Sequence, residues 1–371
     1  MLLKKPVVGK SSGKRVEPLS DAPGADADVD ATTPHGTELA ALPLGHLRAA
    51  RRGGGWTRTD VELKSGERRR PCDRVARVNQ TLPARHLLLA IAVVAIWGTN
   101  FVVMKAAMAH VPPLLLATLR FGFALVPGLL FLPRPKTPWP NMAAYGLMTG
   151  TQFALMYLAV NGHISPGLAS LVVQAQVFFT IGLAMHFARE TVPTYQWFAL
   201  TLAVAGIGVI VLHTDGTTTV GGLAMVLVAA LSWAGANIAS KRAGNVNMLA
   251  FVVWSSGYAV PPLLVLSLTF EGVEVIRTSL QNASAATWGA IFWQAWGNTL
   301  FGYAAWGWLL ARHPAATISP IALLVPVFGM GSAALLIGES LPPWKLYAAL
   351  LVMAGLALNV LWPRLRMRLA A

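Results

Sequence analysis

The side chains in this sequence that could do chemistry are amides set among apolar residues. The stretch SLVVQAQVFFTIGL, residues 170–183, holds Gln174 and Gln176 in otherwise hydrophobic surroundings. A primary amide has two donors and two acceptor lone pairs, and burying it without partners costs several kcal/mol in a medium that cannot form hydrogen bonds. Two amides in one apolar run therefore predict contact with a polar ligand or hydrogen bonds to neighbouring helices.

Aromatic and amide residues recur together at helical spacing. Trp97 and Asn100 are three positions apart, and Trp233 and Asn237 are four apart, so each pair would share one face of a helix. Such pairs could form an aromatic wall with an amide that holds a small polar ligand. They could equally serve hydrogen bonding and aromatic packing between helices.

A further group of polar residues adds to this set. Gln294 and Asn298 also lie four positions apart, on a segment that carries Tyr303, and Gln152 stands in another apolar run. Together with the pairs above, these residues predict an uncharged lining rich in amides and aromatic rings. Such a lining suits a small zwitterion or a neutral polar molecule better than a strongly charged one.

One basic residue lies deep in an apolar segment. Arg120, in ATLRF, could attract the carboxylate of a substrate, or it could pair with backbone carbonyls at a helix end as a structural clamp. Lys105 lies nearer the end of its segment, where a long side chain can extend toward more polar surroundings.

The elements that position these residues must suit a hydrophobic medium. Of the 371 residues, 55% are hydrophobic and only 12% are charged, about half the roughly 25% charged share of a soluble globular protein. Only helices and closed barrels satisfy their backbones within lipid, and no ten-residue alternating pattern is present. The sequence therefore predicts an all-α integral membrane protein.

Ten apolar segments are long enough, at about 18 residues or more, to cross a bilayer as helices. They are residues 87–108, 113–132, 141–160, 166–187, 195–213, 220–240, 247–269, 287–310, 315–337 and 344–362.

The charges are placed unevenly along the chain. Of the 29 Lys and Arg and 15 Asp and Glu, residues 1–85 hold 16 and 10, and residues 1–80 show no periodicity of large apolar side chains. We expect residues 1–85 to form a disordered tail. Much of this tail belongs either to the native protein or to upstream sequence added by a wrongly assigned translation start. The single cysteine, Cys72, lies in this tail, which excludes a disulfide framework.

The remaining basic residues indicate an orientation. With the N-terminus inside the cell, nine of them fall in short cytoplasmic loops or at the C-terminus: Arg134, Lys136, Arg189, Lys241, Arg242, Arg312, Arg364, Arg366 and Arg368. The opposite side has only Arg277 and Lys345. This positive-inside bias predicts that both termini are cytoplasmic, with residues 364–371 as a basic C-terminus.

The apolar part of the chain repeats itself. WGTNFVVMK at residues 97–105 resembles WAGANIASK at residues 233–241, and residues 182–212 match residues 331–361. Three pairs correspond at one offset of 149: Glu190 with Glu339, Pro193 with Pro342, and Gly206 with Gly355. We therefore expect two five-helix repeats, residues 86–214 and 215–363. Because five is odd, the second repeat would be inverted, which is typical of secondary transporters with a substrate site between the halves.

The repeat bears on the two glutamines. Gln174 and Gln176 are about 200° apart around an ideal helix, so we expect one to contact a ligand and the other to bond a neighbouring helix. The offset places Gln176 opposite Val325, beside Pro326. Since interrupted helices mark substrate sites in inverted-repeat carriers, the sequence favours Gln176 as the cavity-facing member.

Residues 86–363 resemble the EamA-type transporters of the drug/metabolite transporter superfamily. The resemblance is carried by WGTNFVVMK, PPLLLATLRF, GLASLVVQAQVFFT, LSWAGANIASK and SPIALLVPVFGMGSAALLIGE. Within that family the sequence is most similar to exporters of O-acetylserine and cysteine. The segment WGAIFWQAWGNTLFGYAAWGW, residues 288–308, departs from the pattern in its many tryptophans.

The expected function is export of small amino-acid metabolites through the bacterial inner membrane by alternating access, as the resemblance implies. The expected partners are a small-molecule substrate and the lipid bilayer, without nucleic acid, metal or cofactor. The tryptophans leave open an exporter of aromatic amino acids or amphipathic drugs. A membrane-embedded enzyme or a receptor would be a different class. An enzyme is not expected, since no paired carboxylates or nucleophile–base constellation lie in the predicted helix centres.

Overall fold

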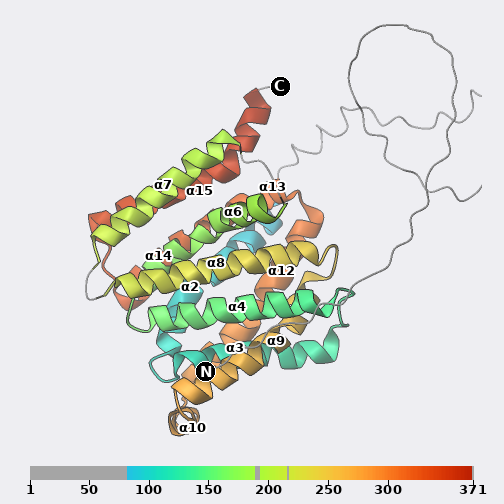
Figure 1. Ribbon diagram of the computed structural model, residues 1–371, viewed down its shortest axis with the longest axis vertical. Helices are drawn as coiled ribbons and strands as arrows, with labels where there is room; N and C mark the ends of the chain where they lie inside the picture. The colour runs from blue at the N-terminus through green and yellow to red at the C-terminus, as the bar shows by residue number, and fades with distance from the viewer. Residues whose placement is uncertain (1–81, 189–192, 215–216, 370–371) are drawn as a thin grey trace, which may run out of the picture. The chain divides into compact units, whose positions relative to one another are not determined.

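The computed structural model describes residues 82–188, 193–214 and 217–369, and within these ranges every regular element is helical and no strand occurs (Figure 1). The predicted tail of residues 1–85 falls almost wholly outside the described residues, as do Glu190 and the last two residues of the chain.

The helices of the first half follow the predicted segments closely. They are α2 (Ala84–Ala107), α3 (Pro113–Phe131), α4 (Trp139–Val160), α5 (Pro166–Val172), the 3-10 turn η2 (Val173–Ala175), α6 (Gln176–Ala188) and α7 (Thr194–Leu212).

The second half contains two interruptions and one additional helix. Its elements are α8 (Val220–Arg242), α9 (Met248–Phe270), α10 (Val273–Gln281), α11 (Ala285–Phe292), the π-helix η3 (Trp293–Phe301), α12 (Gly302–Arg312), α13 (Ala315–Ile318), the 3-10 helix η4 (Ser319–Leu324), α14 (Val325–Ile337) and α15 (Pro343–Leu369). The short helix α10 was not predicted, and α15 continues seven residues beyond the predicted end at residue 362.

Local sequence signals set the ends of these helices. Proline stands in the first turn of α3, α4, α5 and α14, where its missing N–H has no helical partner to lose. The side chains of Thr219, Asn247 and Ser284 accept backbone N–H groups at the starts of α8, α9 and α11. Gly338 ends α14 in the left-handed conformation, with φ 67°.

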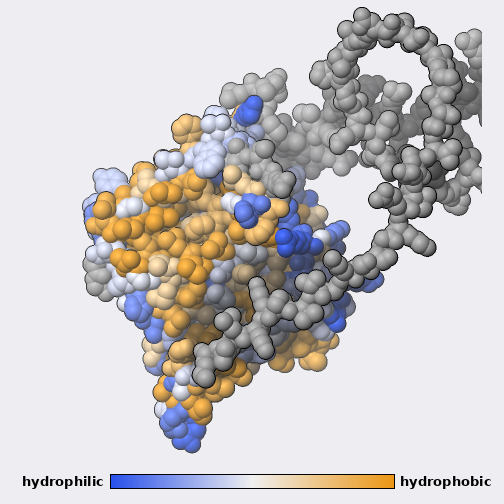
Figure 2. Space-filling view, in the orientation of Figure 1, coloured by the Kyte–Doolittle hydropathy of each residue, from blue (hydrophilic) through white to orange (hydrophobic). Residues whose placement is uncertain are grey.

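Eight helical segments in the described residues are long and apolar enough to cross a membrane: Ala84–Ala107, Pro113–Phe131, Pro166–Phe187, Thr194–Leu212, Val220–Arg242, Met248–Phe270, Ser319–Ile337 and Pro343–Pro363. Hydrophobic side chains cover the broad face around α7, and hydrophilic ones gather at the tip formed by α10 (Figure 2). On α7 the exposed side chains include Trp197, Phe198 and Leu212. This surface suits contact with lipid, and the protein is a multi-pass membrane protein.

Close contacts at two glycines show how α7 and α15 are related. A methyl group added at Gly206 would lie 3.0 Å from the carbonyl oxygen of Ala348, and one added at Gly355 would lie 2.5 Å from that of Ala199. The two contacts exchange under the repeat offset of 149, as expected for elements related by a two-fold axis. Because residue numbers rise along one helix as they fall along the other, the two helices run antiparallel (Figure 1).

Other pairs of helices fit the same axis. Helix α3 packs on α9, its equivalent in the other repeat, and α5 packs on α14, which belong to the interrupted fourth helix of each repeat. Contacts between α2 and α14 are matched by contacts between α8 and α6. The 3-10 turn η2, shifted by 149 residues, falls on the end of η4, so both repeats interrupt the same helix at the same place.

Tight packing at Gly206 leads to a first expected result. Gly206→Ala should lower the free energy of unfolding by about 1–3 kcal/mol, because the added methyl group overpacks the contact with α15. Gly208→Ala is the matched control, since nothing lies within 4 Å of its position on the same helix. Thermal unfolding of the two purified variants in detergent measures the difference. Equal melting temperatures would contradict the packing described.

Candidate functional site

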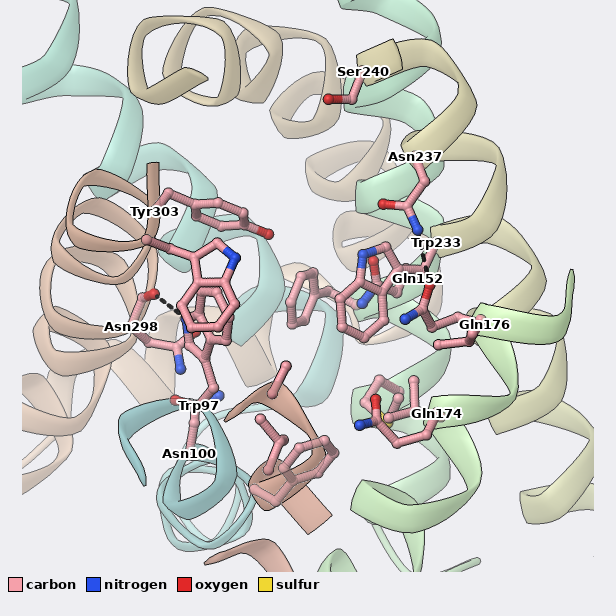
Figure 3. A pocket seen from close by; sticks show the side chains of 18 of the residues that line it. Trp97, Asn100, Gln152, Gln174, Gln176, Trp233, Asn237, Ser240, Asn298 and Tyr303 are labelled. Atoms are coloured by element: carbon pink, nitrogen blue, oxygen red, sulfur yellow. Dashed lines mark hydrogen bonds between the residues drawn. The ribbon is translucent and has the colours of Figure 1, made fainter. Parts of the chain in front are cut away.

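A cavity of about 390 Å³ lies among helices of both halves (Figure 3). Ten of the eleven residues that the sequence selected line it: Trp97, Asn100, Arg120, Gln152, Gln174, Gln176, Trp233, Asn237, Asn298 and Tyr303. The eleventh, Gln294, is fully buried behind the cavity wall.

Equivalent positions of the two repeats contribute to the wall. Trp97 corresponds to Trp233 in the repeated motif, and the residues four places after them, Phe101 and Asn237, also line the cavity. The interrupted helices contribute as well, with Val173 and Gln174 on one side and Ala322 and Leu323 on the other. The two repeats therefore match in position and differ in chemistry, since Gln174 of the first repeat corresponds to Leu323 and Asn237 of the second corresponds to Phe101.

Arg120 is the only residue with a formal charge among the described residues that line the cavity. Its side chain is almost fully buried, at 1% exposure. Nη2 donates to Asn298 Oδ1 at 2.8 Å and Nη1 donates to the Tyr157 hydroxyl at 3.4 Å, while the guanidinium carbon lies 3.9 Å from the centre of the Phe153 ring. Nε has no partner.

Arg120 has no acidic partner in the described part of the chain. The ion pairs found there join Arg277 to Glu274 and Lys345 to Glu339. Removing a charge from water costs several kcal/mol unless a counter-charge and hydrogen bonds replace the lost hydration. Arg120 has neutral hydrogen-bond partners and an aromatic ring, so its charge is only partly compensated.

Gln294 and Tyr157 support Arg120 from behind. The Tyr157 hydroxyl, which accepts from Arg120, donates to Gln294 Oε1 in a short hydrogen bond. Of the expected pair Gln294 and Asn298, only Asn298 lines the cavity, whereas Gln294 contacts Tyr157 from the same π-helix, η3. Thr299 shows this geometry directly, since its hydroxyl donates to the carbonyl oxygen of Gln294 five residues earlier.

Asn298 joins Arg120 to helix α2. Its Nδ2 donates to the carbonyl oxygen of Ile96 at 3.4 Å, and its own carbonyl oxygen accepts from Trp97 Nε1 at 3.2 Å. The Trp97 ring also packs against Tyr303, with 5.9 Å between ring centres. Figure 3 shows these side chains together with Asn100 on one wall of the cavity.

The opposite wall carries the other amides. Asn237 Nδ2 donates to Gln176 Oε1 at 2.8 Å and to Thr180 Oγ1 at 3.2 Å (Figure 3). Gln174 and Gln152 line the cavity and have no hydrogen-bond partner in the described residues. Their whole amide groups are thus available to a ligand, whereas Gln176 and Asn237 each use one amide atom in the bond between them.

The expected roles of Gln174 and Gln176, one contacting a ligand and the other bonding a neighbouring helix, are reversed in one respect. Both line the cavity, and Gln176, expected to be the purely cavity-facing member, is the one that bonds another helix. The physical reason is the 3-10 turn η2, which contains Gln174 and ends just before Gln176, so the ideal α-helical angle used to separate them does not apply.

The two glutamines should respond differently to substitution. Gln174→Leu should reduce the apparent affinity for substrate two- to tenfold, because one ligand hydrogen bond of about 0.5–1.5 kcal/mol is lost, with little change in stability. Gln176→Leu leaves Asn237 with Thr180 alone and should lower the free energy of unfolding by about 0.6 kcal/mol. Transport kinetics and melting temperatures of both variants test this, and identical changes in both quantities would refute it.

Sequence reasoning missed, among others, the two residues of α4 that contact Arg120. Phe153 and Tyr157, which contact Arg120, lie four positions apart on α4, so they share a helix face with each other. That spacing was visible in the sequence, directly after Gln152. In the sequence both resemble ordinary core residues, because the hydrogen-bond partner of a buried tyrosine hydroxyl depends on how the helices pack.

The described acidic residues lie away from the cavity. Glu271 accepts the backbone N–H groups of Leu114 and Leu115 at the start of α3. Glu339 does the same at the start of α5, where Gly167 N lies 2.9 Å away. Carboxylates at helix N-termini are favourably placed in the helix dipole. No group of three or more His, Cys, Asp or Glu that could hold a metal occurs among the described residues.

The comparisons with known proteins agree with this architecture. The EamA-like transporter family matches residues 84–212 and 220–361. The chain belongs to this family. The two matches make it a transporter built from two EamA repeats, which confirms the family suggested by the sequence.

Two relatives are particularly similar to this EamA transporter. Both are named as probable amino-acid metabolite efflux pumps. The Salmonella typhimurium protein is 39% identical over 75% of this chain and 95% of its own length. The Escherichia coli protein is 37% identical over 75% of this chain and 96% of its own length. One crystal structure of a protein with 16% sequence identity has the same fold, with a TM-score of 0.54 over 75% of this chain and 98% of the other.

Proposed function

We propose that this EamA transporter exports small amino-acid metabolites, of the size and polarity of cysteine and O-acetylserine, across the bacterial inner membrane. The observation that carries the proposal is Arg120, a buried cation on the cavity wall without a carboxylate partner in the described residues. A substrate carboxylate would supply the missing counter-charge and accept from the free Nε. The neutral amides opposite suit a small polar side chain.

The names of the two relatives support the same substrate class. Both are efflux pumps for amino-acid metabolites by name, and the alignment covers nearly their whole length. The cavity residues lie within the two stretches that the EamA-like family matches, residues 84–212 and 220–361.

The proposed mechanism is alternating access between two inverted repeats. It counts ten crossings, with residues 139–160 and 285–312 added to the eight apolar spans. These two segments are less apolar because they carry cavity and support residues such as Gln152, Gln294 and Asn298. The antiparallel pairing of α7 and α15 supports the inversion. The basic residues of the short loops support cytoplasmic termini.

The tryptophans of residues 288–308 give little support to the alternative substrates. Trp293, Trp296 and Trp308 are between 38% and 47% exposed on the outer surface. Of the tryptophans in that segment only Trp306 lines the cavity. Side chains on the outer surface suit contact with lipid and do not indicate an exporter of aromatic amino acids or amphipathic drugs.

Uptake into inside-out membrane vesicles tests the proposal. Vesicles that contain the full-length protein should accumulate cysteine or O-acetylserine, since export from the cell corresponds to uptake by such vesicles. Vesicles with Arg120→Gln protein at equal abundance serve as the control. Accumulation of aromatic amino acids alone, or of no amino acid, would refute the proposed substrate class.

A further inference from the structure

Buried polar side-chain atoms without a hydrogen-bond partner occur at several places in the described residues. Two of them belong to cavity-lining side chains: the donor Arg120 Nε and the acceptor Asn100 Oδ1. Asn100 is 5% exposed, and Arg120 is 1% exposed. A buried polar atom left unpaired costs about 1–3 kcal/mol, so an unpaired donor and an unpaired acceptor beside one cavity indicate a ligand with groups of both kinds.

Asn298 links Arg120 to the turn of α2 that precedes Asn100. This residue accepts from Arg120 Nη2 and donates to the carbonyl oxygen of Ile96. Asn100 follows Ile96 by four residues on α2, or about 6 Å along the axis of an α-helix. Figure 3 places Asn100 beside Trp97 and Asn298 on the same wall. Arg120 and Asn100 therefore line the same part of the cavity.

Donors outnumber acceptors around the guanidinium. Besides Arg120 Nε, the Nε2 of Gln294 is buried without a partner. Tyr157 already uses its hydroxyl between Arg120 and Gln294, and Asn298 Oδ1 is occupied by Arg120. A carboxylate adds two acceptor oxygens and a negative charge, which is what this group lacks.

The unpaired oxygen of Asn100 calls for a donor. In an α-amino acid the ammonium group is separated from the carboxylate by one carbon atom, so it must bind near the carboxylate site. No acidic residue lines the cavity within the described part of the chain. The amide oxygen of Asn100 and the neighbouring face of the Trp97 ring are the groups that can receive the ammonium.

We infer that Arg120 and Asn100 form a site for the head group of an α-amino acid, with the carboxylate on Arg120 and the ammonium on Asn100. The inference rests on the proposed function and assigns the head-group atoms within that cavity. It also assigns a selectivity. A carboxylate is required because it faces the one fixed charge, whereas an amine without a carboxylate is repelled by Arg120.

Transport of matched analogues tests the inference. Inside-out vesicles with the full-length protein are first supplied with the twenty protein amino acids and O-acetylserine. The amino acid that accumulates fastest is then challenged with a tenfold excess of its decarboxylated amine or its deaminated acid. The acid should inhibit uptake and the amine should not. Inhibition by the amine as strong as by the unlabelled amino acid would overturn the inference.

Substitutions at Asn100 give the second test. Asn100→Leu should weaken inhibition by the amino acid about two- to tenfold, the value of one hydrogen bond, and leave inhibition by the deaminated acid unchanged. Asn100→Asp should make the amine an inhibitor, because it supplies a negative partner. Asn359→Leu is the matched control, since Asn359 also has an unpaired Oδ1 but lies outside the cavity lining.

The outcomes separate this inference from the proposed function. The head-group site is overturned, while export of amino acids stands, by either of two results. One is that Asn100→Leu weakens inhibition by the amino acid and by the deaminated acid equally. The other is that Asn100→Asp leaves inhibition by the amine unchanged. If no amino acid accumulates, the proposed function and the head-group site both fail. Melting temperatures of the purified variants show whether a loss of transport comes from a loss of folding.

Discussion

Arg120→Gln should reduce the transport of zwitterionic substrates by tenfold or more while the protein still reaches the membrane. Hydrogen bonds to a charged group contribute about 1.5–3 kcal/mol, which corresponds to roughly ten- to more than a hundredfold in apparent affinity. The glutamine retains a polar group near Asn298 but removes the only charge on the described cavity wall. The measurement is uptake into inside-out vesicles at equal protein abundance.

The stability of the same variant distinguishes a ligand-binding residue from a structural clamp. Arg120 is a buried charge without an acidic partner in the described residues, so its replacement by a neutral side chain should leave the melting temperature unchanged or raise it. A clamp predicts the opposite, with poor expression and a lowered melting temperature. Loss of stability together with loss of transport would contradict the role proposed here.

Arg120→Lys is the matched variant for the geometry of the site. Lysine keeps the positive charge but cannot reproduce the planar fork that reaches Asn298 and Tyr157 together. We expect transport intermediate between the native protein and Arg120→Gln. Full activity of Arg120→Lys would show that charge alone is sufficient.

The sequence predicted the helices well because one physical requirement dominates. Runs of apolar residues long enough to span a bilayer must be helical to satisfy their backbones, and most predicted boundaries lie within three residues of those observed. The amphipathic helix α10 escaped prediction because it is short, and with Glu274 and Arg277 it resembles a polar loop.

The cavity residues were selected from the sequence because burying an unpaired polar group in an apolar helix costs free energy. An amide or a guanidinium in an apolar helix needs a partner, and in a protein with an internal cavity that partner is often a ligand or another polar side chain. This argument selected Asn100, Arg120 and Gln174, all of which line the cavity. It could not rank them, because the pairing of Gln176 with Asn237 depends on how α6 meets α8.

Interrupted helices account for the errors in detail. The angle assumed for Gln174 and Gln176 is that of an uninterrupted α-helix, and the 3-10 turn η2, which contains Gln174, changes this angle. Neither η2 nor the π-helix η3 contains a proline, so no local signal in the sequence indicated either interruption. In the second repeat Pro320 and Pro326 do mark the corresponding break around η4.

Glu339→Gln should lower the free energy of unfolding by about 3 kcal/mol, because it leaves Lys345 buried without a counter-charge. Both side chains are nearly inaccessible, at 7% and 5% exposure, and Lys345 Nζ lies 3.0 Å from Glu339 Oε1. Glu339 also accepts from Ser165 Oγ and from the backbone N–H of Gly167, so the pair ties the end of α14 and the start of α15 to the start of α5.

A double substitution separates the ion pair from the helix cap. Glu339→Gln with Lys345→Met removes both charges and should recover most of the lost stability, because the remaining glutamine can still accept from the Gly167 N–H through Oε1 while its Nε2 donates to Ser165 Oγ. Thermal or denaturant unfolding of the single and double variants measures the coupling. A double variant no more stable than Glu339→Gln alone would show that the cap, not the charge pair, holds this junction.

The transport of Glu339→Gln should remain driven by the same gradient as in the native protein. Its carboxylate is occupied by Lys345 and a helix N-terminus away from the cavity, and no acidic residue lines the cavity in the described part of the chain. We therefore expect the double variant, whose stability is restored, to transport at close to the native rate with the same dependence on an imposed pH difference. If proton-driven transport were abolished while substrate binding and expression stayed intact, Glu339 would have to be assigned to energy coupling.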